Sequence, residues 1–150
     1  MNRNGPVDNR MTLSFVSKPE NVAFARAVVA MFASQLDFTI DEIDEIKVAV
    51  SEAVSNAIIH GYEDQPGEVR VEAILSNGRI EVIVHDSGKG IADVAWATEP
   101  THTSRPDERM GLGLVFIREY MDEMRVDSAP NQGTTVHMTK APRSATARAH

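Results

Sequence analysis

The sequence lacks cysteine altogether, and it has no hydrophobic run long enough to cross a membrane. The absence of cysteine excludes disulfide bonds, cysteine-ligated zinc sites and thiol catalysis. A membrane span needs about 20 consecutive apolar residues, and the N-terminal stretch Met1–Pro6 has no apolar core of the signal-peptide kind. These absences predict a cytoplasmic protein with no membrane contact.

Basic charge is also scarce, with 15 Lys and Arg against 22 Asp and Glu and a formal net charge of −7. A general nucleic-acid binder needs a basic surface, so this balance argues against direct nucleic-acid binding. It is compatible with a basic protein partner, although an acidic balance alone is weak evidence for one. With 42% hydrophobic residues over 150 positions, the chain is expected to form one globular domain with a real core.

The first part of the chain predicts a strand and a helix. Residues 1–10 are polar and aperiodic, as is typical of a flexible arm, whereas Thr12–Ser17 alternates as a strand does. Pro19 then opens a helix, where proline is tolerated in the first turn. Arg26 lies off the apolar stripe of that helix and is expected to face solvent.

A second helix has a well-marked start. Thr39 and Glu42 have the spacing of a capping box, and Phe38 and Ile43 have that of the flanking hydrophobic staple. The apolar pattern continues to Gly61, a natural left-handed end residue. We therefore expect one continuous helix up to Gly61.

The second half predicts a hairpin, a long loop, a helix and two closing strands. Asn77–Gly78 is a strong hairpin signal, and residues 92–110 have little periodicity and read as a mobile loop, or lid. A helix is expected over roughly Leu114–Met124, followed by strands at Arg125–Ser128 and Thr134–Thr139.

This order of elements favours an α+β fold, a two-layer sandwich in which three helices cover one face of a mixed, mostly antiparallel sheet. The globular domain is expected to span residues 11–140. Residues 141–150 are expected to form a flexible tail.

Two polar residues, Glu52 and Asn56, interrupt the otherwise apolar second helix, four positions apart and so on one face. A buried, unpaired carboxylate costs several kcal/mol or takes up a proton. Either this face lines a polar cavity in a dry layer, or it lies on a partly exposed helix edge, and these residues alone do not decide between the two.

Glycine-containing motifs occur at three later junctions between elements. Each alone is more often a turn than a site, but together with the polar pair they describe a nucleotide site without a P-loop, since the Gly-x-x-x-x-Gly-Lys-[Ser/Thr] pattern is absent. The three motifs are Asp86-x-Gly88-x-Gly90 after a strand, Gly111-x-Gly113 before a helix, and Gly133-Thr134-Thr135 before a strand.

These residues could hold phosphate and metal. The amides of Gly111 to Gly113, expected at a helix N-terminus, suit an anion, and glycines let the backbone approach closely. Asn56 offers a neutral oxygen to Mg2+, which keeps waters and phosphate oxygens as its other ligands. Arg105 and Arg109, on the long loop, could close over the terminal phosphates.

Two carboxylates have the chemistry for the remaining roles. Asp86 can accept a hydrogen bond from an exocyclic amine, which favours adenine over a base with a carbonyl there. Glu52 could take a proton from an attacking hydroxyl beside the phosphate. Thr103, in the long loop, is also expected to bind the nucleotide.

In order and spacing, these four motifs resemble the N, G1, G2 and G3 boxes of the GHKL ATPase/kinase superfamily. Within it, the chain is similar to the anti-sigma-F factors of spore-forming bacteria over roughly residues 11–140. The residues that carry this closer resemblance are Phe24-Ala25-Arg26, Gln35-Leu36-Asp37, Asp41-Glu42, Arg105-Pro106 and the run from Glu52 to Glu63.

The resemblance implies the GHKL, or Bergerat, ATP-binding fold and a homodimer that binds ATP or ADP. It implies a serine protein kinase that silences a sporulation sigma factor and phosphorylates the anti-anti-sigma factor on serine. The residue matching the exposed arginine of the family's first helix, Arg26, is expected to contact both partners.

The resemblance also implies roles for site residues. Asn56 would hold Mg2+, Glu52 would be the catalytic base and Asp86 would read adenine. Thr134 would support Asp86, and Arg109 would act at the γ-phosphate.

Three alternatives remain open. One is an anti-sigma module that uses nucleotide only as a structural ligand, although it would have no need for Glu52. Another is the detached catalytic domain of a histidine kinase, and a third is the related kinase of the general stress sigma factor. The long loop is slightly shorter than the family pattern and the N-terminal arm is longer, so residue assignments in the loop rest on the weakest match.

Overall fold

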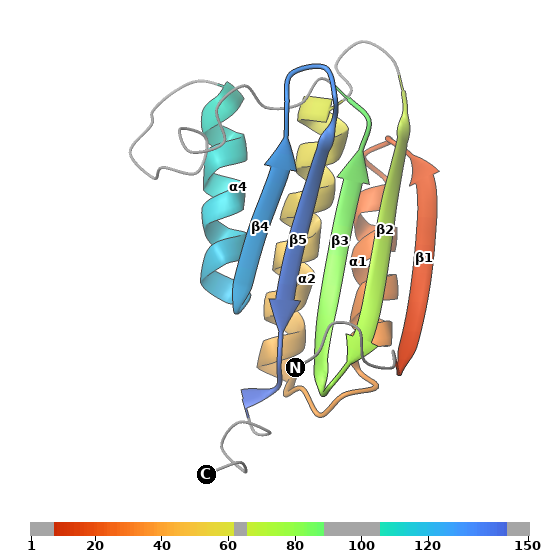
Figure 1. The fold of residues 1–150 in the computed structure, drawn as a ribbon, viewed down its shortest axis with the longest axis vertical. Helices are drawn as coiled ribbons and strands as arrows, with labels where there is room; N and C mark the ends of the chain where they lie inside the picture. The colour runs from red at the N-terminus through yellow and green to blue at the C-terminus, as the bar shows by residue number, and fades with distance from the viewer. Residues whose placement is uncertain (1–7, 62–65, 89–105, 144–150) are drawn as a thin grey trace.

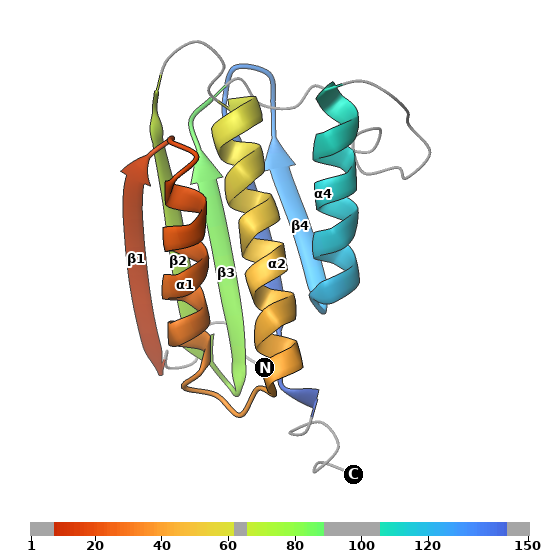
Figure 2. The ribbon, with the colours of Figure 1, turned by 180° about the vertical axis from the view of Figure 1, so that it is seen from behind.

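The computed structural model describes residues 8–61, 66–88 and 106–143. They form a five-stranded sheet with three helices on one face, the two-layer α+β sandwich that the sequence predicts (Figures 1 and 2). The strands are β1 (Asn9–Val16), β2 (Glu68–Ser76), β3 (Arg79–Asp86), β4 (Glu123–Ser128) and β5 (Thr134–Lys140), and the helices are α1 (Asn21–Ala33), α2 (Ile40–Asn56) and α4 (Pro106–Tyr120).

The sheet has the order β1-β2-β3-β5-β4, and each of these four described pairings is antiparallel. A two-residue turn at Asn77–Gly78 joins β2 to β3, with φ angles of 52° and 72°. Positive φ at both turn residues matches the right-handed twist of the flanking strands, which is why Asn-Gly predicts this hairpin correctly.

The central helix, α2, begins with the predicted capping box. The Thr39 Oγ1 atom accepts from the Glu42 amide at 3.2 Å, and the Glu42 carboxylate accepts from the Thr39 amide at 2.9 Å. In Figure 2, α2 runs between α1 and α4 over the middle of the sheet. This position makes α2 the element that faces most of the core.

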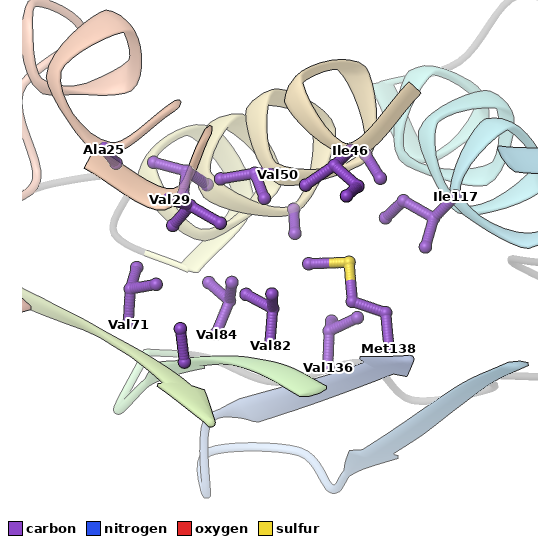
Figure 3. Close-up of a cluster of buried hydrophobic side chains, with 14 of the residues drawn as sticks. Ala25, Val29, Ile46, Val50, Val71, Val82, Val84, Ile117, Val136 and Met138 are labelled. Carbon is purple, nitrogen blue, oxygen red and sulfur yellow. The ribbon is translucent and has the colours of Figure 1, made fainter. Parts of the chain in front are cut away.

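The core lies between the helices and one face of the sheet, as Figure 3 shows. Alternate residues of β3 point into it, so Ile80, Val82 and Val84 are buried. Burying a side chain of this size contributes roughly 1.5–3 kcal/mol. The next position on the same face is Asp86, which places a carboxylate where the apolar layer ends.

The C-terminal end of β5 returns to the start of α2. Lys140 is buried, donates to the Tyr120 carbonyl at 2.6 Å and lies 3.5 Å from the Glu45 carboxylate. The Arg143 amide donates to the Glu42 carboxylate at 2.8 Å. The first residues of the predicted flexible tail are therefore held against α2.

Three predicted boundaries are wrong. The sheet begins at Asn9, so the last residues of the predicted arm belong to β1. The helix α4 begins at Pro106 rather than near Leu114, and it ends at Tyr120. Proline has the φ of a first helical position, and Arg118 suits the negative end of the helix dipole. The last five residues of the predicted lid are thus helical. Within the described ranges, no helix has the length and apolarity needed to span a bilayer.

Candidate functional site

The polar pair of α2 is partly buried, beside Gly113 of α4. Glu52 and Asn56 are both half-buried, and Ala53 and Val54 between them are buried. The Asn56 Nδ2 atom is buried and, within the described part of the chain, has no hydrogen-bond partner. A buried amide without a partner costs free energy, so this atom marks a place suited to a polar ligand.

Burial raises the pKa of the Glu52 carboxyl. Among the described residues, no hydrogen bond to its carboxylate offsets this effect. A carboxyl group with a raised pKa is a stronger base than an ordinary one, and such groups cluster at functional sites.

The helix α4 packs directly onto this pair at Gly113. A Cβ atom at Gly113 would lie 2.8 Å from Glu52 Oε2 and 3.2 Å from Asn56 Nδ2. Gly113 therefore lets the backbone of α4 approach Glu52 and Asn56 more closely than any side chain would permit.

The prediction that Gly111 and Gly113 begin a helix is wrong here. Both lie inside α4, so their amides are not those of its first turn. The amides of an α-helix that lack intrahelical partners are the first four, which in α4 follow Pro106. Arg109 lies in that first turn, and its side chain is outside the described part of the structure.

The carboxylate of Asp86 lies at the end of β3 and is 4% exposed. Burial raises its pKa, and hydrogen bonds from the amides of Gly88 and Thr134 partly oppose this rise. The Gly88 amide lies 2.9 Å from Asp86 Oδ1. The group is a buried acceptor held in place by backbone donors.

Gly133 fixes the backbone beside Asp86. Its φ is +81°, and a Cβ atom there would lie 2.2 Å from the Asp86 carbonyl oxygen. Only glycine combines this conformation with this contact. Glycine is therefore required in the turn before β5 because the turn lies against Asp86. The sequence alone did not predict this contact.

Asp86, Thr134 and Ser128 form one row across β3, β5 and β4. Asp86 is paired with Thr134, and Thr134 with Ser128. The Ser128 Oγ atom donates to the Gly133 carbonyl at 2.9 Å and lies 2.8 Å from Thr134 Oγ1. Sequence reasoning missed Ser128, because only the register of β4 against β5 brings it to this row.

A π-helical turn follows Asn56. The turn η1 (Ala57–Gly61) replaces the regular helix that was expected to continue to Gly61. Such turns are rare and frequently lie at functional sites. The sequence carries no signal for it, because the apolar pattern continues through it.

Other predicted residues are not brought to this site by the described structure. Gly90, Thr103 and Arg105 lie outside the described residues. Arg26 was expected to face solvent, but it is half-buried because its Nη1 atom donates to Ser51 Oγ at 3.3 Å, which holds the side chain along α2.

The residues present fit a magnesium–nucleotide ligand. The unpartnered Nδ2 donor of Asn56 suits a phosphate oxygen, and its Oδ1 atom suits Mg2+. Glu52 adds a carboxylate beside it, and Asp86 a buried acceptor at a strand end. Within the described ranges there is no cluster of three or more His, Asp or Glu residues able to hold a metal ion. Mg2+ bound mainly through phosphate oxygens and waters needs no such cluster.

Comparison with known proteins shows the family to which the chain belongs. Residues 15–140 match the family model described as the histidine kinase-like ATPase domain. The chain is 51% identical over 133 residues to the anti-sigma F factor of Thermoanaerobacter sp. (strain X514), covering 88% of this chain and 93% of that one. It is 50% identical over 135 residues to the anti-sigma F factor of Clostridium beijerinckii, covering 89% and 94% of the two chains.

Solved structures support the fold alone, because their sequence identity is low. The RsbU and RsbW domains of a Mycobacterium tuberculosis protein match with a TM-score of 0.63 and 20% identity, covering 89% of this chain and 32% of that one. The histidine kinase domain of a blue-light activated kinase from Erythrobacter litoralis matches with a TM-score of 0.54 and 17% identity, covering 84% and 61%. With a family model that spans most of the domain and relatives that are half identical along their length, the chain belongs to the anti-sigma F factor family of histidine kinase-like ATPase domains.

Proposed function

We propose that this chain is an ATP-dependent serine protein kinase and anti-sigma factor. It would bind and inhibit a sporulation sigma factor and phosphorylate the anti-anti-sigma factor of that sigma factor on serine. The observation that carries the proposal is the pair on α2: a carboxyl group with a raised pKa, one helical turn from a buried amide without a partner. The half-identical relatives named anti-sigma F factor support the regulatory part.

Glu52 would act as the general base of the transfer. Its carboxylate would take the proton of the substrate serine hydroxyl as that oxygen attacks the γ-phosphorus. The bond from the γ-phosphorus to the β–γ bridging oxygen would break, and ADP would leave. Burial raises the pKa of Glu52, and this brings the group closer to the range in which a base is effective at neutral pH. A pure binding module has no use for a carboxylate that costs stability in this position.

Asn56 would hold Mg2+ through its Oδ1 atom. The ion, when bound with ATP, would neutralise charge on the phosphoryl group, and positioning would supply most of the remaining catalysis. The contact of Gly113 with both Glu52 and Asn56 supports a shared role for the three residues. Arg109 would add positive charge at the γ-phosphate.

Asp86 would recognise adenine. Its buried carboxylate, held by the Gly88 and Thr134 amides, is an acceptor for the exocyclic amine. Thr134 would support this contact. The glycines and loop residues predicted to bind the nucleotide would complete the site: Gly88, Gly90, Thr103, Arg105, Gly111 and Gly113.

The partner surface would include Arg26 on α1. On the same helix, Phe24 is 51% exposed and Met31 is 74% exposed, and their spacing of seven positions places both on one exposed apolar face. Large apolar side chains exposed on one helix face are a feature of protein-binding surfaces. The chain would act as a homodimer in the cytoplasm.

Incubation with γ-labelled ATP and the anti-anti-sigma factor tests the enzymatic part. We expect acid-stable phosphoserine on the partner. Acid-labile phosphate would favour a histidine kinase domain, and no transfer would favour a module that uses nucleotide only as a structural ligand.

Size-exclusion chromatography with sporulation and general stress sigma factors, each with ATP or ADP, tests the regulatory part. A complex is expected with the sporulation sigma factor. If it forms only with the stress sigma factor, or with neither, this part of the proposal is wrong.

A further inference from the structure

We infer that Ser128 determines base specificity, because it fixes the hydroxyl group of Thr134 as a hydrogen-bond acceptor beside Asp86. It is a positioning residue, since it acts through Thr134. The inference rests on the proposed function, in which Asp86 reads adenine. It assigns a role to a residue that lies on β4, outside all four nucleotide-box motifs.

The register of the sheet places Ser128 next to Thr134. In antiparallel strands, directly paired residues point to the same face. Asp86, Thr134 and Ser128 are paired in sequence across β3, β5 and β4, so their side chains lie on the face that the helices cover. Asp86 is buried, and both hydroxyl residues are half-buried. The three side chains therefore form one polar row at the end of the core.

The direction of each hydrogen bond in this row follows from the number of protons available. A serine hydroxyl has one proton. The Ser128 proton goes to the Gly133 carbonyl at 2.9 Å, because a carbonyl oxygen can only accept. With that proton committed, we assign the 2.8 Å contact between the two hydroxyl groups to the proton of Thr134, with Ser128 Oγ as acceptor. Thr134 Oγ1 is left with lone pairs only.

Two acceptors therefore lie side by side on β3 and β5. In its ionised form the Asp86 carboxylate has no proton to donate, and the Thr134 hydroxyl has committed its own. A purine with a 6-amino group carries two N–H donors that can reach these acceptors directly or through one water. A purine with a 6-oxo group places an acceptor opposite them and leaves buried groups unpaired, which is the strongest source of rejection in a polar site.

Without Ser128, this pattern would be lost. In Ser128→Ala the Thr134 hydroxyl is free to rotate and donate, so a 6-oxo purine gains a donor that the wild-type chain denies it. We expect the preference for ATP over inosine triphosphate to fall about tenfold, the size of one hydrogen bond of about 1.4 kcal/mol. Inosine triphosphate is a suitable probe because its base has a 6-oxo group and an N1 proton where adenine has the 6-amino group and a bare N1.

The experiment measures dissociation constants of ATP and inosine triphosphate, with Mg2+, for the full chain by isothermal titration calorimetry. Ser128→Thr keeps one hydroxyl proton and is expected to keep the wild-type preference. Ser14→Ala makes the same change on β1, far from the row, and is the matched control. Thr134→Val removes the hydroxyl and keeps the branched shape, so it tests whether the Thr134 hydroxyl contributes to the preference. Ser128→Cys, with a weaker donor of similar size, tests Ser128 itself if Ser128→Ala does not fold.

The outcomes separate the inference from the function on which it rests. A lower preference in Ser128→Ala and Thr134→Val, with Ser128→Thr unchanged, supports the role of Ser128. Equal weakening of both nucleotides, with the ratio preserved, would mean that Ser128 only stabilises the turn, and it would overturn the inference. A wild-type chain without any preference would instead overturn the assignment of Asp86 to adenine.

Discussion

Two glutamates on α2 have opposite environments. Glu42, at the start of the helix, is 0% exposed, and its carboxylate accepts from the amides of Thr39 and Arg143. Burial alone would raise its pKa, but these hydrogen bonds and the Arg143 charge lower it. Glu52, near the other end, has burial without compensating bonds, and its pKa is raised.

The comparison shows that hydrogen bonding, more than burial, decides whether the pKa of a glutamate on this helix is lowered or raised. The Glu42 carboxylate has hydrogen-bond donors, so its charge stabilises the fold and its affinity for a proton is low. Glu52 is left under-bonded by its surroundings, so its charge costs free energy and its affinity for a proton is high. The same helix thus carries a structural group at its start and a candidate base near its end.

Gly113→Ala is expected to have a large effect on the rate of phosphotransfer, and it acts on Glu52 alone of the two glutamates. The added Cβ would lie 2.8 Å from Glu52 Oε2, so the carboxylate must move. A displacement of about 1 Å near the reacting groups can lower the rate about 100-fold. Stability should not fall in parallel, because alanine favours a helix over glycine by up to about 1 kcal/mol.

Initial rates of phosphotransfer and thermal unfolding of Gly113→Ala test this separation. An alanine variant that loses stability and keeps its rate would show that the contact is structural. The Gly78→Ala variant serves as the control for loss of a glycine, since Gly78 lies in the β2–β3 turn, and a Cβ there would meet nothing within 4 Å. Its strained φ of +72° lowers stability and should leave the rate of folded protein unchanged.

Glu42→Ala should have the next largest effect, on stability. It removes the capping box and leaves the amides of Thr39 and Arg143 without their acceptor. Loss of a cap costs about 0.5–2 kcal/mol. Urea unfolding measures this change. Nucleotide affinity should stay at the wild-type value, and a large loss of affinity would contradict the structural role of Glu42.

The smallest expected effect is on the pH dependence of the unfolding free energy, which should have opposite signs for Glu42 and Glu52. The folded pKa of Glu42 is lowered, so its contribution is present above its unfolded pKa and is lost as pH falls through the folded value. The folded pKa of Glu52 is raised, so its contribution is favourable at acid pH and is lost as pH rises through that value.

Unfolding free energies from pH 4 to pH 7 test these signs. The stability of Glu52→Gln relative to the wild-type chain should rise with pH, and that of Glu42→Gln should fall. Parallel curves for the two variants would contradict the difference between the glutamates.

Local sequence was sufficient where the cause is local. The capping box of Thr39 and Glu42 and the Asn77–Gly78 hairpin each follow from residues a few positions apart, and both are confirmed. The spacing of Glu52 and Asn56 also predicted their common face. The family resemblance is also confirmed. It could be predicted from the sequence because it rests on four motifs in a fixed order.

Features that depend on tertiary contacts could not be predicted. The Arg143 amide reaches Glu42 from 101 positions away, and Ser128 meets Thr134 only through strand register. The close approach of Gly113 to Glu52 depends on how α4 packs against α2. The start of α4 was not predicted because its first turns lack apolar residues at helical spacing. Gly111 and Gly113, which were expected to begin the helix, lie inside it.

The most direct test of the central claim compares Glu52→Gln with Glu42→Gln in phosphotransfer. Glutamine keeps the size of each side chain, and it also serves in a capping box. The account predicts that Glu52→Gln lowers transfer by about 10²–10⁴-fold, the usual contribution of a general base, while ATP affinity is kept and Glu42→Gln remains active. Transfer by Glu52→Gln at the wild-type rate would contradict the account.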